Sequence, residues 1–293
     1  MIFDRTRLKG KDFENNTLSL PKSNYFIKIP KYIDIHQIKC IIVKKFYGKV
    51  KLNISYEKDV NIKKLNKNNY LGIDIGVENI VSITTDNQIK KSWIVKGGCI
   101  KSINQFYNKK LAKRKSILET VNNQKTSRWI QKLHMKRNNK LEYEFHCLSK
   151  KIIDLCLENN IGNIVIGHNK NWKNKCDLGK KMNQKFIQIP FNSLIQKIQY
   201  KVEEVGISFV QTEESFTSKI DHLANEDMKK QDNYLGKRTK RGLFESSCNK
   251  ILNADINGAI GILRKKNVFS DADLISLRNR GDVVSPLVLK YKP

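Results

Sequence analysis

The sequence lacks a long hydrophobic segment. None of its 293 residues belongs to an apolar run near the roughly 20 residues that a helix needs to cross a bilayer. The first ten residues, MIFDRTRLKG, have no signal-peptide core. Hydrophobic residues still make up 39% of the chain, which places it in the globular class. The sequence therefore predicts a globular, cytoplasmic protein with no membrane partner.

Paired cysteines are also missing. No two of the six have the C-x-x-C spacing that is typical of zinc sites. Without a secretory signal, disulfides are not expected either. We interpret all six as ordinary buried or half-buried thiols: Cys40, Cys99, Cys147, Cys156, Cys176 and Cys248.

Acidic residues are few compared with basic ones. The chain has 56 Lys and Arg against 28 Asp and Glu, a formal net charge of +28. Such an excess repels itself in a compact state unless a polyanion neutralises it. Part of it can reflect codon bias, because a chain rich in Lys, Asn and Ile is typical of an AT-rich genome. Its size and its spread along the chain favour nucleic acid as the partner.

The apolar patterns predict an α/β protein. Alternating runs from Leu18 to Tyr56 indicate a small β-region with a hairpin that turns near Gly48. After a polar linker at 61–69, YLGIDIGVENIVSITT contains two strands of a central sheet. Residues 100–160 repeat apolar side chains at helical spacing without Pro or Gly, which predicts two long basic helices.

The second half of the chain alternates strands and helices. We expect a strand at 164–166, a helix at 191–205, a strand in ISFVQTEE and a closing helix in DINGAIGILRKK. The predicted parts are a β-module at 1–66 and a main domain at 67–266, followed by a tail at 267–293. The main domain includes the helical insertion at 100–160 and an irregular basic insert at 217–252.

Two aspartates are candidate metal ligands. Asp74 lies in the apolar strand LGIDIGV, where a carboxylate is costly to bury unless it is paired or binds a cation; alternatively it caps a turn. Asp255 opens the helix of NADINGAIGIL, where aspartate is also a common cap. Together they fit phosphodiester hydrolysis by two Mg²⁺ ions about 4 Å apart, which needs carboxylates from distant segments.

The order of these motifs resembles that of TnpB proteins, the RNA-guided nucleases of insertion sequences that are also called OrfB transposases. LGIDIGVENIVSITT, the basic helices, NIVIGHNKNWK, EESFTSK and NADINGAIGIL follow in the family's order. The resemblance implies a RuvC-like (RNase H-like) nuclease core after a partial oligonucleotide-binding β-barrel. It also implies an RNA-guided, Mg²⁺-dependent DNA endonuclease in transposition, with guide RNA and a DNA target as partners. By this resemblance, Asp74 and Asp255 match the first and last catalytic aspartates of the family.

The chain departs from the family at three points. The family's second catalytic motif has a Glu where the strand IVIG here ends in Gly167. The four-cysteine zinc finger is absent, because residues 219–252 contain only Cys248, and we expect no zinc. The amino-terminal helical part of a full-length member is expected to be truncated or missing.

The missing Glu has a candidate replacement in the next strand, ISFVQTEESFTSK. Glu213 and Glu214 point to opposite faces of a strand, so at most one of them faces the site. We predict Glu214, which makes Asp74, Glu214 and Asp255 the catalytic residues and the ligands of two Mg²⁺ ions. The alternative is that both glutamates are solvent-facing charges.

Two basic segments are candidates for nucleic-acid binding. In YLGKRTKRGLF, basic residues are flanked by aromatic ones, which suits phosphate contact and base stacking. The first long helix carries a second group. Although charge runs are often only solvated faces, we predict phosphate contacts for Lys109, Lys110, Lys113, Arg114, Lys237, Arg238, Lys240 and Arg241.

Gly167 is the residue that separates two hypotheses of function, an active nuclease and a protein that binds DNA without cutting it. If Glu214 replaces the missing carboxylate, the chain is an active guided endonuclease. If the site has decayed, the chain is a guided DNA-binding protein that does not cut, or the remnant of a transposon gene. The usual activity of the family favours the nuclease.

Overall fold

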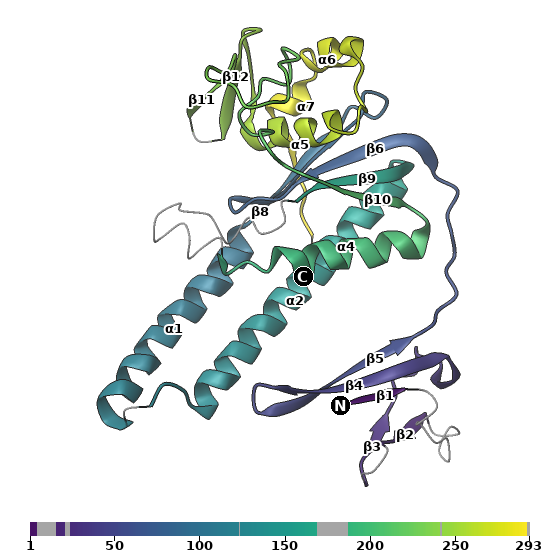
Figure 1. Ribbon diagram of the computed structural model, residues 1–293, viewed down its shortest axis with the longest axis vertical. Coiled ribbons are helices and arrows are strands. Elements are labelled where there is room, and N and C mark those ends of the chain that lie inside the picture. Colours follow the sequence, from purple (N-terminus) through teal and green to yellow (C-terminus); the bar gives the residue numbers. More distant parts are fainter. Residues whose placement is uncertain (5–15, 21–23, 123, 169–186, 241, 292–293) are drawn as a thin grey trace. The chain divides into compact units, whose positions relative to one another are not determined.

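The computed structural model describes residues 1–4, 16–20, 24–122, 124–168, 187–240 and 242–291. The chain forms two compact units (Figure 1). The first consists of Met1–Val60 and Tyr107–Asn138, and the second of Asn61–Phe106 and Asn139–Pro293. The far part of the helical insertion therefore belongs with the β-module, a grouping that the sequence did not predict.

The first unit contains short antiparallel strands. One sheet has the order β1 (Ile2–Asp4), β4 (Ile38–Phe46) and β5 (Lys49–Tyr56), and β2 (Thr17–Ser19) pairs with β3 (Phe26–Lys28). Tyr47 and Gly48 form the two-residue turn between β4 and β5, with φ of 50° and 74°, which confirms the predicted hairpin. Six buried aliphatic residues form the core: Leu18, Ile29, Ile33, Ile35, Ile38 and Ile41.

Two long helices confirm the predicted insertion, α1 (Gly98–Asn122) and α2 (Arg128–Glu158). Within the first unit, the β4–β5 turn contacts α2. The Tyr47 ring stacks on the His134 ring with centroids 5.7 Å apart, and Asn138 Nδ2 donates to the Tyr47 hydroxyl at 2.7 Å. These contacts explain why the helix ends group with the β-module.

The second unit contains a six-stranded sheet in the order β10-β9-β6-β7-β8-β14. Its strands are β6 (Asn66–Asp74), β7 (Asn79–Thr85), β8 (Ser92–Lys96), β9 (Ile161–Gly167), β10 (Ser208–Thr212) and β14 (Leu287–Val288). Strands β6, β7 and β8 pair antiparallel, whereas β9 and β10 run parallel to β6. The register pairs Ile73 with Ile166, so Asp74 and Gly167 end neighbouring strands at the same edge.

Helices cover both faces of this sheet (Figure 1). Side chains alternate along a strand, so Ile164 and Ile166 face one core while Val165 faces the other. The first core includes α2 and α4 (Phe191–Val205), and the second includes Ile262 and Leu263 of α5 (Ala254–Arg264). The model is therefore an α/β protein with a mixed sheet.

The basic insert at 217–252 is not irregular, contrary to the prediction. It contains a small antiparallel sheet of β11 (Lys237–Lys240), β12 (Leu243–Ser246) and β13 (Lys250–Asn253). A fully buried carboxylate, Asp221, holds its edge: it accepts hydrogen bonds from Ser246 Oγ at 2.8 Å and from the Ser247 backbone N at 2.7 Å. All four residues of β11 are exposed, so this strand has no alternating apolar pattern that would predict it.

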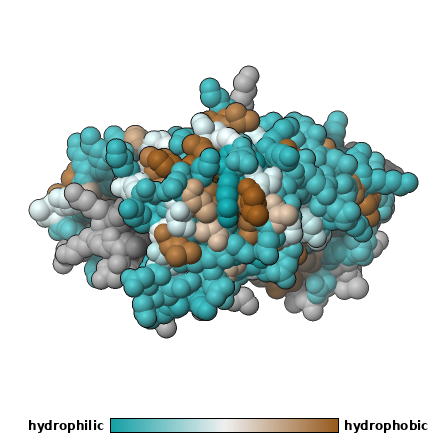
Figure 2. All heavy atoms as spheres, turned by 90° about the horizontal axis from the view of Figure 1, so that it is seen from above, coloured by the Kyte–Doolittle hydropathy of each residue, from teal (hydrophilic) through white to brown (hydrophobic). Residues whose placement is uncertain are grey.

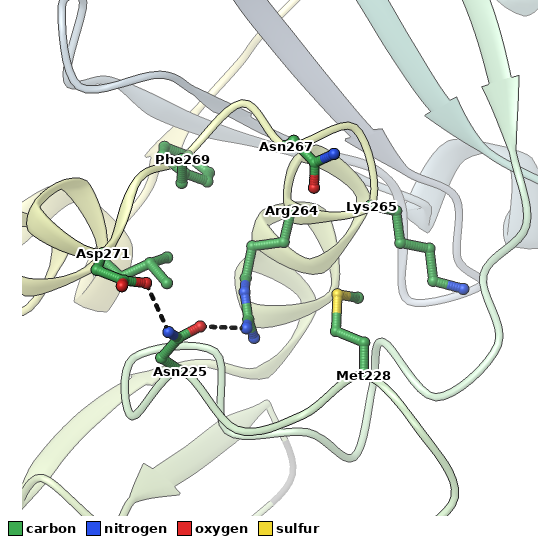
Figure 3. A pocket seen from close by; sticks show the side chains of 8 residues that line it. Asn225, Met228, Arg264, Lys265, Asn267, Phe269 and Asp271 are labelled. Carbon is green, nitrogen blue, oxygen red and sulfur yellow. Dashed lines mark hydrogen bonds between the residues drawn. The ribbon is translucent and has the colours of Figure 1, made fainter.

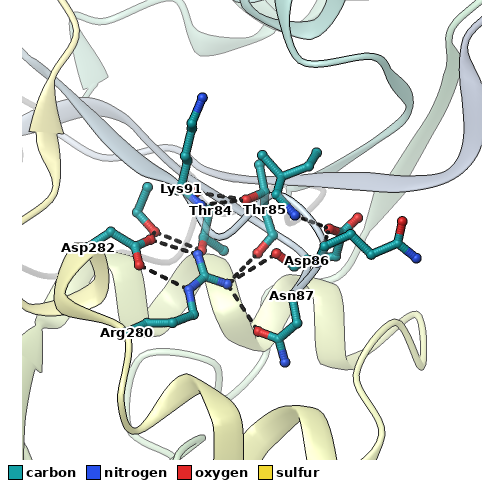
Figure 4. A network of polar contacts seen from close by, with 10 residues as sticks. Thr84, Thr85, Asp86, Asn87, Lys91, Arg280 and Asp282 are labelled. Atoms are coloured by element: carbon teal, nitrogen blue, oxygen red, sulfur yellow. Dashed lines mark hydrogen bonds and ion pairs between the residues drawn. The ribbon is translucent and has the colours of Figure 1, made fainter.

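The segment after residue 266 is part of the fold and not a loose tail. Helices α6 (Asp271–Leu277) and α7 (Gly281–Val284) follow α5, and β14 joins the sheet beside β8. Arg280 is buried and donates to the carbonyl oxygens of Thr85 and Asp86 at 3.0 and 3.2 Å (Figure 4). Arg280 also pairs with Asp282 at 2.7 Å. Its hydrogen bonds to Thr85 and Asp86 connect this segment to the end of β7.

The surface carries mainly hydrophilic residues on the face that Figure 2 shows, with hydrophobic residues in small separate groups. Among the described residues, no helix has both the length and the hydropathy needed to cross a membrane.

Candidate active site

Asp74 lies at the end of β6, where α5 passes close beside it. A Cβ atom at Gly258 of α5 would come within 2.8 Å of Asp74 Oδ2. The missing side chain at Gly258 therefore leaves the room that the Asp74 carboxyl occupies. Nothing in the sequence marked Gly258, because its importance depends on how α5 packs against the sheet.

The pKa of Asp74 is shifted by burial and by several charged side chains around it. Burial raises the pKa of Asp74 well above its usual value of 3.8, and the negative charges of Glu214 and Asp255 raise it further. Arg238 and a backbone hydrogen bond from Ile75 lower it. The structure thus brings Asp74, Glu214 and Asp255 into one electrostatic cluster from three distant segments.

Glu214 lies over Gly167. A Cβ atom at position 167 would come within 2.6 Å of Glu214 Cγ and 2.8 Å of Glu214 Oε1. The Glu214 carboxyl therefore takes the space that a side chain at 167 would need. Burial raises its pKa to about 7, although the positive charge of Lys265 acts against the rise.

Glu213 points elsewhere. It is exposed, and its carboxylate accepts a hydrogen bond from the Ser215 hydroxyl. Of the two adjacent glutamates, Glu214 is therefore the one placed beside Asp74.

Asp255 lies in the first turn of α5. The side chain of Asn253 caps this helix by accepting from the backbone N of Asp255 and of Ile256, so Asp255 does not serve as the cap. The Asp255 carboxylate instead accepts from Asn79 Nδ2 at 2.7 Å. Asn79 is a second site residue that the sequence did not indicate.

The predicted basic residues separate into those near the carboxylates and those elsewhere. Arg238 lies within electrostatic reach of Asp74, although it is exposed on β11 like Lys237 and Lys240. On α1, Lys109, Lys110 and Lys113 are exposed, and the Arg114 guanidinium lies 5.9 Å from the Trp129 ring centroid. Arg241 lies outside the described residues.

The donor set suits a hard divalent cation. Among the residues that the structure describes, no three His, Cys, Asp or Glu side chains form a ready-made metal site. Carboxylates repel one another unless a cation lies between them, and three carboxylates are the oxygen ligands that Mg²⁺ prefers. In donor type, the carboxylate oxygens of Asp74, Glu214 and Asp255 therefore fit Mg²⁺. The five described cysteines are free thiols, and Cys176 lies outside the described residues.

A cavity of about 480 Å³ lies at the carboxyl end of α5 (Figure 3). Its polar side chains pair with one another: Arg264 donates to Asn225 Oδ1, and Asn225 Nδ2 donates to Asp271 Oδ1 at 2.7 Å. Arg264 also contacts the buried His222, a residue that the sequence analysis did not single out.

Comparisons with known proteins point to one family. A family model described as probable transposase (OrfB_IS605) matches residues 53–173, and one described as Cas12f1-like, TNB domain, matches residues 191–262. Both matches support a relation of this chain to the TnpB/OrfB family.

Two curated relatives support this assignment. A CRISPR-associated endodeoxyribonuclease Cas12f1 from Sulfoacidibacillus thermotolerans is 26% identical over 72% of this chain and 49% of its own length. A TnpB-like protein, ORF457, from Acidianus two-tailed virus is 24% identical over 71% of this chain and 44% of its own length. The chain therefore spans about half the length of the curated relatives it matches.

A solved structure shares the fold. The cryo-EM structure of the Cas12f1–sgRNA–target DNA complex aligns with a TM-score of 0.55 at 21% identity, over 77% of this chain and 45% of that one.

Proposed function

We propose that this TnpB/OrfB protein is an RNA-guided, Mg²⁺-dependent DNA endonuclease of an insertion sequence, with Asp74, Glu214 and Asp255 as its catalytic carboxylates. The observation that carries the proposal is the position of Glu214 over Gly167, within electrostatic reach of Asp74. Glu214, just after the end of β10, supplies a carboxylate at the place where β9 ends in Gly167 and has none.

The fold supports a RuvC-like, RNase H-like core. A mixed sheet carries Asp74 on its central strand β6, and α5, which packs against that sheet, carries Asp255. The first unit, with two small sheets around one core, suits an oligonucleotide-binding β-barrel module. The exposed lysines of α1 suit contacts with RNA or DNA phosphates.

The chain's own residues divide the work of phosphodiester hydrolysis. Asp74, Glu214 and Asp255 would hold Mg²⁺, which when bound activates water and neutralises charge on the phosphate. Asn79 orients Asp255 through its hydrogen bond. Arg238, which lies near Asp74, would contact the phosphate next to the carboxylates.

The test is a cleavage assay of the complex purified with its RNA, on DNA that matches the guide, with and without Mg²⁺. We expect Asp74→Asn and Glu214→Gln to abolish cleavage while RNA binding persists. Glu213→Gln is the matched control and should cleave like the unchanged protein. DNA binding without cleavage by the unchanged protein would favour the alternative, a guided DNA-binding protein with an inactive site.

A further inference from the structure

The turn that carries Glu214 is held by its own hydrogen bonds. The Glu214 carbonyl oxygen accepts from the Thr217 backbone N at 3.2 Å and from Thr217 Oγ1 at 2.9 Å. Thr217 is buried, with 3% of its surface exposed. The backbone position of Glu214 therefore depends on where Thr217 lies.

Thr217 is bonded in turn to His222, which is fully buried. His222 Nε2 lies 2.8 Å from the Thr217 carbonyl oxygen, and His222 Nδ1 lies 2.9 Å from Arg264 Nη1. A carbonyl can only accept and a guanidinium can only donate, so Nε2 carries the proton and Nδ1 is bare. Burial, together with the positive charge of Arg264, lowers the pKa of His222 to about 3, so the ring stays neutral at physiological pH.

Helix α5 supplies the support for this histidine. A Cβ atom at Gly261 would lie 2.4 Å from His222 Nε2 and 2.9 Å from Thr217 Cβ. Glycine at this position therefore allows His222 and Thr217 to pack directly against the helix. Asn257 of the same helix donates to the Ile220 carbonyl oxygen at 2.9 Å. Helix α5 thus contacts the segment between Glu214 and His222 at three positions: Asn257, Gly261 and Arg264.

We propose that His222 is a positioning residue that fixes Glu214 relative to Asp255 by linking Thr217 to α5. Because α5 also carries Asp255, one helix would set the spacing of two of the three carboxylates. The inference rests on the proposed function, since it assumes that Glu214 binds the metal ion. Partners that orient metal ligands typically contribute about 10- to 100-fold to metal affinity.

The test measures the Mg²⁺ concentration that gives half-maximal cleavage by the RNA complex, and the rise in melting temperature that Mg²⁺ alone produces. His222→Leu, which removes both hydrogen bonds at similar volume, should raise the half-maximal Mg²⁺ concentration about 10-fold or more. His222→Gln keeps a donor for Thr217 and should recover most of the loss. In a Glu214→Gln background, where no cleavage is expected, His222→Leu should cause no further loss of the rise in melting temperature that Mg²⁺ produces.

Leu148→Ala is the structural control, because Leu148 is buried in the core between α2 and the sheet and contacts none of these residues. It should lower the melting temperature without changing the Mg²⁺ requirement. Should His222→Leu fail to fold, Gly261→Ala tests the same link by displacing the ring. The inference is overturned if the His222 and Gly261 variants require no more Mg²⁺ than Leu148→Ala does. If the unchanged protein responds to Mg²⁺ in neither assay, the proposed function falls, and this inference with it.

Discussion

Two carboxyl groups of the candidate site, those of Asp74 and Glu214, are buried at a cost to the stability of the fold. Asp74 and Glu214 both have a raised pKa because burial disfavours their charged forms, and Asp74 also lies near two other acidic groups. Sites that bind ligands are often locally destabilising in this way. The cost can be measured at one residue.

Glu214→Gln should stabilise the metal-free protein at high pH. The folded-state pKa is about 7 and the usual value is 4.5, so the folded state holds its proton more tightly than the unfolded one. Glu214 therefore has no net effect below about pH 4.5, and its ionisation costs stability increasingly up to about pH 7. Full ionisation costs on the order of 3 kcal/mol. In EDTA, thermal melts should show a higher melting temperature for Glu214→Gln at pH 8 and little change at pH 4.5.

Glu213→Gln, at an exposed position, provides the comparison and should leave both melting temperatures nearly unchanged. An equal effect of Glu214→Gln at the two pH values would contradict the raised pKa.

Arg238 and Lys240 lie on the same strand but should behave differently. Arg238 lies near Asp74, and a cation there can stabilise charge that develops on the phosphate. Arg238→Ala should lower the single-turnover cleavage rate about 100-fold while DNA binding changes little. Lys240→Ala, at an exposed position, should affect binding modestly and leave the cleavage of bound DNA unchanged. Equal behaviour of the two variants would remove Arg238 from the site.

At the scale of elements, the small β11-β12-β13 sheet depends on a buried carboxylate. Asp221 accepts bonds from Ser246, Ser247 and the Ala224 backbone N, and the adjoining Glu226 accepts from the backbone N of Asp221 and of Leu235. This network connects the segment before β11 with the β12–β13 turn. It is built from carboxylate oxygen acceptors with hydroxyl and amide donors.

Asp221→Ala should therefore unfold this element at low denaturant. The substitution leaves several buried donors without an acceptor, which costs about 3 kcal/mol or more. Urea unfolding followed by hydrogen exchange of β11–β13 measures the loss. Asp227→Ala, at an exposed aspartate that pairs with the exposed Lys229, should change the midpoint very little. A midpoint for Asp221→Ala that matches that of Asp227→Ala would show that the network adds no stability.

At the scale of the whole molecule, the net charge of +28 predicts salt-dependent binding of nucleic acid. Binding of single-stranded RNA should weaken steeply as salt rises, because each neutralised phosphate contributes about −0.7 to the log–log slope. The double variant Lys109→Glu, Lys113→Glu should make the slope shallower by about 1.4. The single charge reversal Lys229→Glu, at a lysine that already pairs with Asp227, is the comparison and should alter the slope by less than half as much.

Filter binding at several salt concentrations provides the slope. A nearly flat dependence for the unchanged protein would indicate that the charge reflects genome composition and not a nucleic-acid partner.

Local patterns in the sequence determined the elements whose signal is local. The β4–β5 hairpin is readable from alternating residues around Gly48, and the helices α1 and α2 from apolar spacing without Pro or Gly. The same patterns identified Asp74 and Asp255, because a carboxylate in an apolar strand and one at a helix start are both visible in sequence. They failed for β11, where all four residues are exposed, and for the segment after residue 266.

Only the tertiary structure decided how these pieces form a site. That Glu214 and not Glu213 lies over Gly167 depends on the turn after β10, and Arg238 comes within electrostatic reach of Asp74 from the separate β11-β12-β13 sheet. The roles of Gly258, Gly261 and His222 depend on α5 packing against the sheet and the turn after β10. Contacts between residues far apart in the chain leave no periodic pattern in the sequence, because each one is set by the packing of whole elements.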